Sequence, residues 1–499
     1  MLKIVLEIIQ VLYVLCLLGM AAYGFNSLVL TVLYFRAKLC KKSPHRSQIE
    51  KVPLEWPRVT VQMPIYNERY IVSRLLQAVR GLEYPPGRLQ VQVLDDSTDG
   101  TRLLVEREVR RIQEQGLNIA CIHRVDRSGF KAGALNEGLK TASGELIAIF
   151  DADFLPPADW LKRTVPAFQR PDLGCLQTRW GHLNGNYNAF TRAISLGIDG
   201  HFIVEQTARS SNGLFLNFNG TAGIWRRACI DDAGGWQPDT LTEDLDLSYR
   251  AQLRGWKIGY LPDVVVPAEL PVQIEAFKKQ QYRWARGSFQ TVRKLLPELL
   301  KADIPEVVRL EGILHITGYM VQPLMLLSML LMLPVGWFAP QYLKFFPFTL
   351  LASFGPPILY LVSRTENAPR FWDRLSRLPL MILVGFGLSL NNSLAVFEGL
   401  FGRGTGTFVR TPKFNLRGQH DAWESSAYIV PLSGMVWLEM LLAIYAMLTI
   451  YLLLPRLGLS VAPWMLVYTI SYLYISLTNI IQNLVAEDVQ HSLRSSLFN

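Results

Sequence analysis

Two pairs of aspartates stand at the ends of two apolar stretches. Asp95 and Asp96 close the run in "VQVLDDSTDG", and Asp151 and Asp153 close the run in "GELIAIFDADF". Apolar runs of this length, bounded by turn residues, predict buried strands. Open α/β sheets bind their ligands in the crevice outside the carboxyl ends of the strands. We therefore expect the four carboxylates to gather at one edge of a sheet.

Such a concentration of negative charge calls for a cation. The Asp-x-Asp motif of residues 151–153 has no His or Cys beside it, so its oxygen ligands favour Mg²⁺ or Mn²⁺ over zinc. These ions commonly bridge the phosphates of a nucleotide and offset the charge on a leaving diphosphate. The aspartates predict a metal–nucleotide site, although either pair taken alone would also fit a solvated loop.

Two further motifs suit a nucleotide. "RVTVQMPIYNE" predicts a first strand that ends in a turn, where Tyr66 can stack on a base and Glu68 can accept a hydrogen bond from its imide. "RSGFKAGALNEGL" places Lys131 at the start of a helix, where its ammonium and free backbone amides suit phosphate. A packed turn tyrosine and an ordinary helix entry are the alternatives.

A pair of acids and an aromatic–basic helix face complete the candidate chemistry. "TLTEDLDLSYR" predicts a helix capped by Thr242, with Glu243 and Asp244 facing the crevice so that one can take a proton. "QQYRWARG" puts Gln280, Arg283 and Trp284 on one helix face, where the arginine suits a diphosphate and the tryptophan a sugar ring. Helix-dipole stabilisation and membrane-interface anchoring are the alternatives.

The elements that must position these residues include membrane helices. Half of the 499 residues are hydrophobic, and residues 8–35 contain no charge. That stretch exceeds the about 20 residues a span needs and the core of a signal peptide, so a retained transmembrane helix is predicted over 1–37. Later apolar stretches lie at the following positions: 313–337, 345–363, 379–400, 428–454 and 464–486.

Between these segments, residues 58–300 have the charge content and alternating patterns of an α/β domain. The basic linker at 38–57 places that domain in the cytoplasm, by the positive-inside rule, on a plasma (inner) membrane or an endomembrane. The remaining chain is predicted to form these units: an interface helix and two transmembrane helices over 301–364, an interfacial or re-entrant helix and a loop over 365–427, two transmembrane helices over 428–486, and a cytoplasmic tail over 487–499.

The stretch at 379–400 is not expected to cross the bilayer. A crossing would put the basic residues that follow it outside, against the positive-inside rule: Arg403, Arg410, Lys413 and Arg417.

The net charge of +9 is concentrated next to membrane segments, and the sequence contains no zinc-finger, RNA-recognition or helix-turn-helix pattern. It therefore predicts contact with membrane lipids and no nucleic-acid partner. The five cysteines are scattered without metal-binding spacing, so we expect reduced structural thiols.

The order of the motifs resembles the processive members of glycosyltransferase family 2 over about residues 58–293. "VQVLDDSTDGT", "FKAGAL", "AIFDADF", "FNGTAGIWR" and "AGGW" are similar to the plant cellulose-synthase-like A proteins, which are glucomannan and mannan synthases, and to their bacterial relatives. "QQYRWARGS" is nearer to bacterial cellulose synthases. The resemblance implies a GT-A-type, Rossmann-like domain inserted between the transmembrane helices of a multi-pass membrane protein.

The resemblance also implies a role for each matched residue. The donor-binding set is Tyr66, Glu68, Asp95, Asp96, Lys131, Asp151, Gln280 and Arg283. Asp153 would ligate Mg²⁺ or Mn²⁺, and Asp244 would be the general base. Glu243 and Trp284 would contact the acceptor.

"GTGTFVRTPKF", at residues 404–414, resembles the F-x-V-T-x-K gating loop of cellulose synthases. The matched positions are Phe408, Arg410, Thr411 and Lys413, with Arg410 where that pattern has Val. Without the resemblance, a basic loop beside the membrane explains these residues equally well.

The implied function is inverting, processive transfer of a hexose from GDP-mannose or UDP-glucose to a growing β-1,4-linked glycan, with export through the membrane helices. One alternative is a transferase that adds a single sugar to a lipid, such as a glucosyl-diacylglycerol synthase. Another is a transporter or scaffold that senses nucleotide sugars. The partners are thus a nucleotide-sugar donor and a glycan or lipid acceptor; the sequence predicts no oligomeric state.

Overall fold

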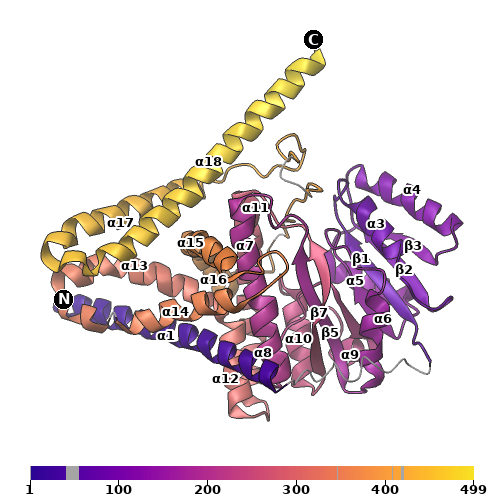
Figure 1. Ribbon diagram of the computed structural model, residues 1–499, viewed down its shortest axis with the longest axis horizontal. Helices are drawn as coiled ribbons and strands as arrows, with labels where there is room; N and C mark the ends of the chain where they lie inside the picture. The colour runs from indigo at the N-terminus through magenta and orange to yellow at the C-terminus, as the bar shows by residue number, and fades with distance from the viewer. Residues whose placement is uncertain (1, 41–54, 346, 407, 417–420, 499) are drawn as a thin grey trace.

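The computed structural model describes residues 2–40, 55–345, 347–406, 408–416 and 421–498 (Figure 1). Most of the predicted linker at 38–57, together with Arg417, lies outside the described residues. A sheet with helices on both faces forms one side of the molecule, and long apolar helices form the other (Figure 1). Between the two lie α7 (Ala189–Asp199) and α11 (Ile274–Lys301).

Within the described residues, seven strands form one mixed sheet in the order β3-β2-β1-β4-β6-β5-β7. The strands are β1 (Val59–Ile65), β2 (Leu89–Asp95), β3 (Ile119–His123), β4 (Leu146–Ile149), β5 (Leu173–His182), β6 (Gly223–Arg226) and β7 (Lys257–Ala268). The first four in this order pair in parallel, whereas β6 runs antiparallel to both β4 and β5. The predicted α/β domain is therefore present.

The register of the parallel strands explains where the motifs meet. Ile65 at the end of β1 pairs with Asp95 at the end of β2, while β4 stops at Ile149, opposite Gln62. Because parallel strands end at the same edge of a sheet, the residues that follow all three emerge together.

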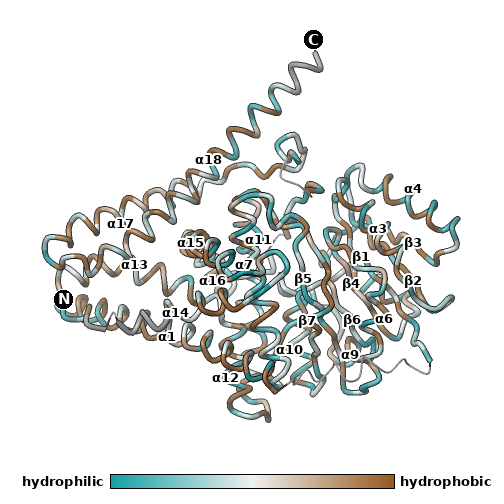
Figure 2. The backbone as a smooth tube through the Cα atoms, in the orientation of Figure 1, coloured by the Kyte–Doolittle hydropathy of each residue, from teal (hydrophilic) through white to brown (hydrophobic). Residues whose placement is uncertain are grey.

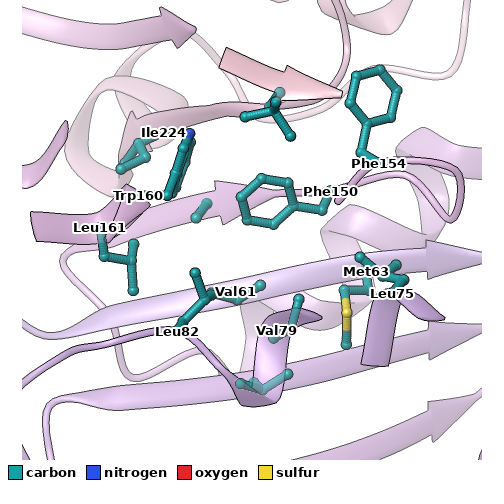
Figure 3. Packing of buried hydrophobic residues seen from close by; sticks show 14 of the residues in the cluster. Val61, Met63, Leu75, Val79, Leu82, Phe150, Phe154, Trp160, Leu161 and Ile224 are labelled. Atoms are coloured by element: carbon teal, nitrogen blue, oxygen red, sulfur yellow. The ribbon is translucent and has the colours of Figure 1, made fainter. Parts of the chain in front are cut away.

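Helices cover both faces of this sheet. They are α3 (Val72–Arg80), α4 (Thr101–Glu114), α5 (Phe130–Thr141), α6 (Trp160–Thr164), α8 (Gln206–Ser211), α9 (Arg227–Asp232) and α10 (Glu243–Leu253). Residues of α3, α4 and α6 pack in one apolar core, and those of α5, α9 and α10 in another. Figure 3 shows the first core, where Phe150 and Trp160 meet edge to face with ring centroids 4.7 Å apart. Their burial stabilises the sheet edge from which Asp151 and Asp153 project.

The second part of the molecule is helical. Its helices are α1 (Leu2–Leu39), α12 (Glu306–Ile316), α13 (Val321–Phe338), α14 (Pro347–Val362), α15 (Phe371–Gly387), α16 (Ser389–Phe401), α17 (Met435–Leu457) and α18 (Ala462–Phe498). The predicted tail from residue 487 continues α18 as helix. A Cβ atom on Gly355 would lie 2.0 Å from the carbonyl oxygen of Gly24, so α14 and α1 approach closely, in the manner of small-residue contacts between membrane helices.

Four helical segments of the described chain are long and apolar enough to cross a membrane. They are Lys3–Leu39, Gly318–Phe338, Met435–Ser460 and Ala462–Ser492. Large apolar side chains such as Leu15 on α1 and Leu441 on α17 are exposed, as expected of lipid-facing surfaces, and Figure 2 shows the hydropathy along these helices.

The two remaining apolar stretches differ from these spans. Helix α14, in the stretch predicted at 345–363, has 16 residues, and at 1.5 Å per residue it reaches about 24 Å, short of the about 30 Å hydrocarbon core. The stretch at 379–400 breaks between α15 and α16 with a bend of 46°, the form of a broken span or a re-entrant loop. The predicted number and orientation of crossings stay predictions.

Candidate active site

A cavity of about 200 Å³ lies at the carboxyl ends of β1, β2 and β4. We call it the first cavity. Its lining includes nearly every predicted site residue: Tyr66, Glu68, Asp96, Lys131, Asp151, Asp153, Glu243, Asp244, Gln280, Arg283, Trp284, Phe408, Arg410, Thr411 and Lys413. Seven segments that are separate in the sequence thus meet at one cavity, as the motif order predicts.

Asp95 is the predicted donor-binding residue that the structure does not bring to this cavity. Its side chain is fully buried, and its carboxylate lies 2.9 Å from Nδ1 of His123, its partner in the β2–β3 register. It also accepts a hydrogen bond of 3.1 Å from the backbone N–H of Ser97. Asp95 therefore stabilises the turn that presents Asp96.

Asp96 lines the cavity and forms an ion pair with a neighbouring arginine. The guanidinium of Arg124 binds both of its oxygens, at 2.8 and 2.5 Å, and also donates to the carbonyl oxygen of Phe130. This bidentate pair ties the loop after β3 to the end of β2. Sequence reasoning missed Arg124, because a basic residue in that loop has no distinctive spacing.

Lys131 lies in the first turn of α5 between the strand ends and α10. Its Nζ lies 2.5 Å from a carboxylate oxygen of Asp151 and 4.0 Å from Glu243, and it donates to the carbonyl oxygen of Gly220 at 2.9 Å. Burial alone would lower the pKa of Lys131, but the two carboxylates raise it, so the ammonium stays charged. The predicted phosphate-binding cation is well placed.

Gly220 is a site residue that sequence reasoning missed. It has φ +84°, and a Cβ atom there would lie 2.9 Å from Oδ2 of Asp244 and 3.4 Å from Nζ of Lys131. Only glycine meets both requirements without strain. The motif "FNGTAG" contained the signal, but its spacing does not identify which glycine lies next to the acid.

Asp244 and Glu243 begin α10 and face the cavity. Asp244 accepts a hydrogen bond of 2.9 Å from the backbone N–H of Leu245. Burial raises the pKa of both acids, and Lys131 partly offsets the effect. The predicted cap is wrong in its detail: Thr242 precedes the helix, but its side chain makes no capping hydrogen bond, and its hydroxyl lies 3.5 Å from that of Thr291.

Helix α11 carries the Gln-x-x-Arg-Trp face, and a glycine in this helix allows its backbone to approach the turn before Glu243 and Asp244. A Cβ atom on Gly287 would lie 2.6 to 2.8 Å from atoms of Thr242, so the helix backbone touches the turn before Glu243. The side-chain oxygen of Gln290 accepts the backbone N–H of Leu241 at 2.8 Å. Asp244, the predicted base, and Trp284, the predicted platform, are thus held close together by backbone contact between their helices.

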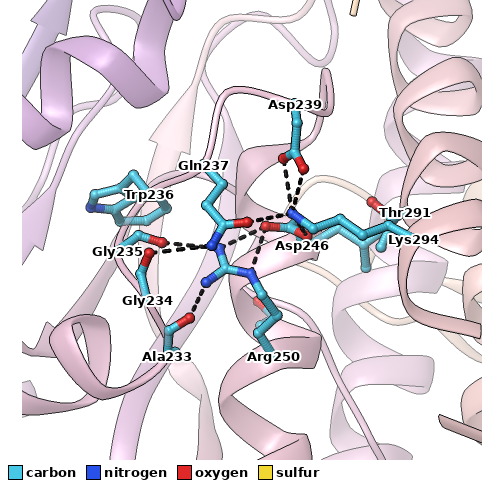
Figure 4. A network of polar contacts seen from close by, with 12 residues as sticks. Ala233, Gly234, Gly235, Trp236, Gln237, Asp239, Asp246, Arg250, Thr291 and Lys294 are labelled. Atoms are coloured by element: carbon cyan, nitrogen blue, oxygen red, sulfur yellow. Dashed lines mark hydrogen bonds and ion pairs between the residues drawn. The ribbon is translucent and has the colours of Figure 1, made fainter. Parts of the chain in front are cut away.

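A buried polar network also fixes the start of α10 and the loop that precedes it (Figure 4). Asp246 is fully buried and pairs with Arg250 at 2.6 Å and with Lys294 of α11 at 2.9 Å. Lys294 also binds Asp239, and Arg250 donates to the carbonyl oxygen of Gly235. This network joins α10, α11 and the loop between α9 and α10.

The predicted gating loop inserts two cations into the first cavity. Lys413 lies 2.6 Å from the carboxylate of Asp153, and Arg410 lies 3.0 Å from that of Glu68. Arg283 donates to the carbonyl oxygen of Val409 at 2.6 Å. Burial raises the pKa of Glu68 to about 8, although Arg410 opposes this rise.

The chemistry of the donor set fits a divalent cation shared with a substrate. Asp151 and Asp153 provide hard oxygen ligands on one turn, beside Lys131. In the part of the chain that the structure describes, no three His, Cys, Asp or Glu side chains form a ready-made cage. Magnesium-like ions are commonly held by one or two carboxylates together with substrate phosphates, which matches this arrangement.

A larger cavity of about 490 Å³ continues from the first one toward the membrane helices, and we call it the second cavity. The two cavities share these lining residues: Trp180, Ile198, Asn219, Thr242, Asp244 and Trp284. Beyond them, its walls carry uncharged polar and aromatic groups such as Gln281, Tyr319 and Asn392. Asp244 and Trp284 therefore stand where a cavity rich in charged side chains meets one lined mainly by uncharged groups.

Comparison with protein families identifies the α/β part. Residues 57–287 match the family model described as "Glycosyltransferase like family 2".

Two curated relatives of this chain are named for the same enzymatic activity. "Glucomannan 4-beta-mannosyltransferase 2" of Arabidopsis thaliana is 43% identical over 281 residues, which cover 55% of this chain and 53% of the relative. "Glucomannan 4-beta-mannosyltransferase 1" of Oryza sativa subsp. japonica is 38% identical over 312 residues, 60% of each chain. The chain thus spans about half to three-fifths of the relatives it matches. The predicted resemblance to glycosyltransferase family 2 and to the glucomannan synthases is confirmed.

Among solved structures, the mannosyltransferase PcManGT from Pyrobaculum calidifontis, in complex with GDP-Man and Mn²⁺, is similar with a TM-score of 0.54. The match covers 78% of this chain and 99% of that one, at 23% identity. The shared fold, together with the seven-stranded mixed sheet, confirms the predicted GT-A-type domain.

Proposed function

We propose that this chain, built around a glycosyltransferase family 2 domain, is a hexosyltransferase that moves a mannosyl residue from GDP-mannose to the end of a β-1,4-linked glycan. The observation that carries the proposal is the place of Asp244, whose side chain lines both cavities. A general base must reach the acceptor hydroxyl while the donor is bound. The names of the curated relatives support mannose as the transferred sugar.

In the proposed reaction, an acceptor hydroxyl oxygen attacks the anomeric carbon of the donor. The C–O bond to the diphosphate breaks as the new glycosidic bond forms, and the hydroxyl proton passes to Asp244. One displacement inverts the anomeric configuration, so an α-linked donor gives a β bond without a covalent intermediate. The raised pKa of Asp244 suits this role, because a stronger base takes the proton more readily.

The leaving diphosphate gains negative charge, and the cations of the first cavity are arranged to stabilise it. Lys131 and Arg283 project into that cavity from α5 and α11. Asp151 and Asp153 would hold Mg²⁺ or Mn²⁺, and the bound ion would supply further charge stabilisation on the phosphate oxygens. The Mn²⁺ in the PcManGT complex supports the choice of ion class.

We further propose that transfer is processive and that the glycan leaves through the membrane helices. The second cavity begins at Trp284 and reaches residues of α12, α13 and α15, including His315, Gln322 and Met381. A sugar ring stacks well on tryptophan, and uncharged polar groups suit its hydroxyls. In this proposal the catalytic domain faces the cytoplasm, where the donor is made.

The test is transfer by membranes that contain the full chain. They are supplied with radiolabelled GDP-mannose or UDP-glucose and with Mg²⁺ or Mn²⁺, and Asp244→Asn provides the blank. We expect polymer from GDP-mannose, absent from the blank, that β-mannanase digests and β-glucanase does not. A single organic-soluble glycolipid would overturn the polymerase proposal in favour of a lipid transferase, and donor binding without turnover would favour the sensor.

A further inference from the structure

A group of polar and charged side chains lies buried where α11 meets α17 and α18, outside the lining of both cavities. Nζ of Lys278 on α11 lies 2.6 Å from Oε1 of Glu439 on α17 and 3.7 Å from Oε2 of Glu275, one turn earlier on α11. Asn479 of α18 donates to Glu275 at 2.8 Å. None of these four residues is more than 3% exposed. We call them the buried anchor.

Stability alone does not explain the buried anchor. Charged groups lose their hydration when they are buried, and apolar side chains of similar size often stabilise a fold as well as a buried ion pair does. Ionisable residues in membrane helices are rare and commonly mark functional sites. Glu439 lies near the start of the candidate span Met435–Ser460, and its Oε2 atom has no hydrogen-bond partner among the described residues. The pair therefore points to a role beyond packing.

An ion pair fixes the register of two helices in a way that apolar contact does not. Apolar faces can slide past one another, whereas a buried ammonium meets a buried carboxylate at one position only. Gln482 of α18 fixes the same end of α11, because its side chain accepts the backbone N–H of Ile274 at 2.9 Å and donates to the carbonyl oxygen of Val272 at 3.0 Å. The N-cap residue Gln273 makes no side-chain cap, so α18 caps α11 instead.

The buried anchor lies on the opposite side of α11 from the candidate site. At about 100° per residue, Gln280, Arg283 and Trp284 lie about 140° to 240° around the helix from Lys278. Those three residues line the first cavity, and Gly287 on the same helix touches the turn before α10. A displacement of α11 at the anchor would therefore move the arginine and the tryptophan together, relative to the acids of α10.

We propose that Lys278 and Glu439 are positioning residues for sugar transfer, whose ion pair sets the place of α11 and so the positions of Arg283 and Trp284. This inference rests on the proposed function, because sugar transfer is the reaction that the helix aligns. Neither residue of the pair lines a cavity, so each acts through α11. The membrane helix α17 thereby takes part in the alignment of the site.

The experiment compares Glu439→Gln with wild type as the detergent-solubilised full chain. Glutamine keeps the size of the side chain and removes the charge that fixes Lys278. Calorimetry with GDP and Mn²⁺ counts the binding-competent molecules, and transfer from GDP-mannose is expressed per competent molecule. We expect kcat to fall about tenfold or more, because small displacements of aligned groups slow a reaction strongly. The Kd for GDP should change less than about threefold, since most residues that line the first cavity lie on other elements.

A double variant separates the position of α11 from the burial of charge. Lys278→Met together with Glu439→Leu replaces the pair by apolar side chains of similar size, which should bring the melting temperature back to that of wild type. The register is then no longer fixed, so kcat per competent molecule should stay about threefold or more below wild type. A double variant with the kcat of wild type would overturn the proposal, because the pair would then matter to stability alone.

The matched control is Glu311→Gln. Glu311 on α12 pairs with Arg209 on α8 at 3.3 Å, and both residues are buried and line neither cavity. Loss of this charge should lower the melting temperature, as in Glu439→Gln, but leave kcat per competent molecule within about twofold of wild type. An equal loss of kcat in the control, or an unchanged kcat in Glu439→Gln, also overturns the proposal.

Hydrogen exchange distinguishes failure of this inference from failure of the proposed function. Amides of the first turns of α11, residues 274–287, should exchange about tenfold faster in Glu439→Gln and at the wild-type rate in Glu311→Gln. This measurement does not depend on sugar transfer. Faster exchange in a protein that transfers no sugar overturns the function and leaves the anchor standing. Equal transfer and equal exchange in wild type and Glu439→Gln overturn the anchor alone.

Discussion

The two cavities meet at one carboxylate, yet they differ in chemistry. The first is lined by acidic and basic side chains in close pairs, such as Lys131 with Asp151 and Lys413 with Asp153. The second has no lysine or arginine among its lining residues, and apart from Asp244 its carboxylate is Glu205. A cavity rich in charged pairs suits a nucleoside diphosphate and its metal, and one lined mainly by uncharged groups suits a sugar chain. This difference supports the proposed arrangement, in which the donor binds on one side of Asp244 and the acceptor on the other.

Removing the carboxylate that the two cavities share should abolish transfer while leaving donor binding intact. Asp244→Asn is expected to lower kcat about 10²- to 10⁴-fold, because the acceptor proton loses its base. Affinity for GDP should stay within about threefold. Steady-state transfer from GDP-mannose and GDP calorimetry on the same preparation measure the two effects.

Asp246→Asn, two residues further on, is the comparison variant. It should lower the melting temperature, since it leaves Arg250 and Lys294 without their buried partner. Retention of more than a tenth of kcat in Asp244→Asn would remove the basis for the proposed division.

A methyl group at Gly220, beside Asp244 where the two cavities meet, should lower kcat less than Asp244→Asn does. Gly220→Ala places Cβ 2.9 Å from Oδ2 of Asp244 at a backbone φ of +84°, so kcat should fall about tenfold or more. The left-handed conformation also costs about 1–2 kcal/mol of stability. Gly213→Ala shares the positive φ, at +67°, but meets nothing within 4 Å. It should show the same loss in chemical denaturation with unchanged kcat; equal losses of kcat would contradict the contact.

The acid limb of the pH–rate profile sharpens the assignment of the base. Burial raises the pKa of Asp244, and only the deprotonated carboxylate accepts a proton, so activity should fall as the pH drops through this raised value. The limb should therefore lie above the ordinary aspartate value of about 3.9 and fall about tenfold per pH unit.

Glu243→Gln removes a neighbouring negative charge and should move this limb to lower pH, when each profile is normalised to its own maximum. A limb that stays at the same pH in Glu243→Gln would argue against coupling between the two acids.

The smallest expected effect concerns the second cavity alone. Trp284→Ala removes the platform at the entrance of the second cavity and should shorten the product about three- to tenfold, measured by gel filtration of labelled polymer. The KM for GDP-mannose should hardly change. Trp372→Ala, at a 73% exposed position on α15, is the control and should leave the product length as in wild type. A rise in donor KM with unchanged product length would place Trp284 on the donor side.

The sequence by itself determined which residues are candidates for the chemistry and in what order they occur. Motifs on the ends of β1, β2 and β4 meet because parallel strands end together, which is a property of the fold class and needs no coordinates. Trp284, Arg283 and Gln280 likewise share a face because the helical period requires it.

The tertiary structure decided which of several plausible side chains face the site. Successive strand residues point to opposite faces, so Asp95 turns inward to His123 and only Asp96 reaches the cavity. Arg124 and Arg127 lie three residues apart in one loop, and packing alone gives one to a carboxylate and the other to a ring. The pairing of Lys413 with Asp153 joins segments 260 residues apart, and local sequence patterns carry no information on such distant contacts.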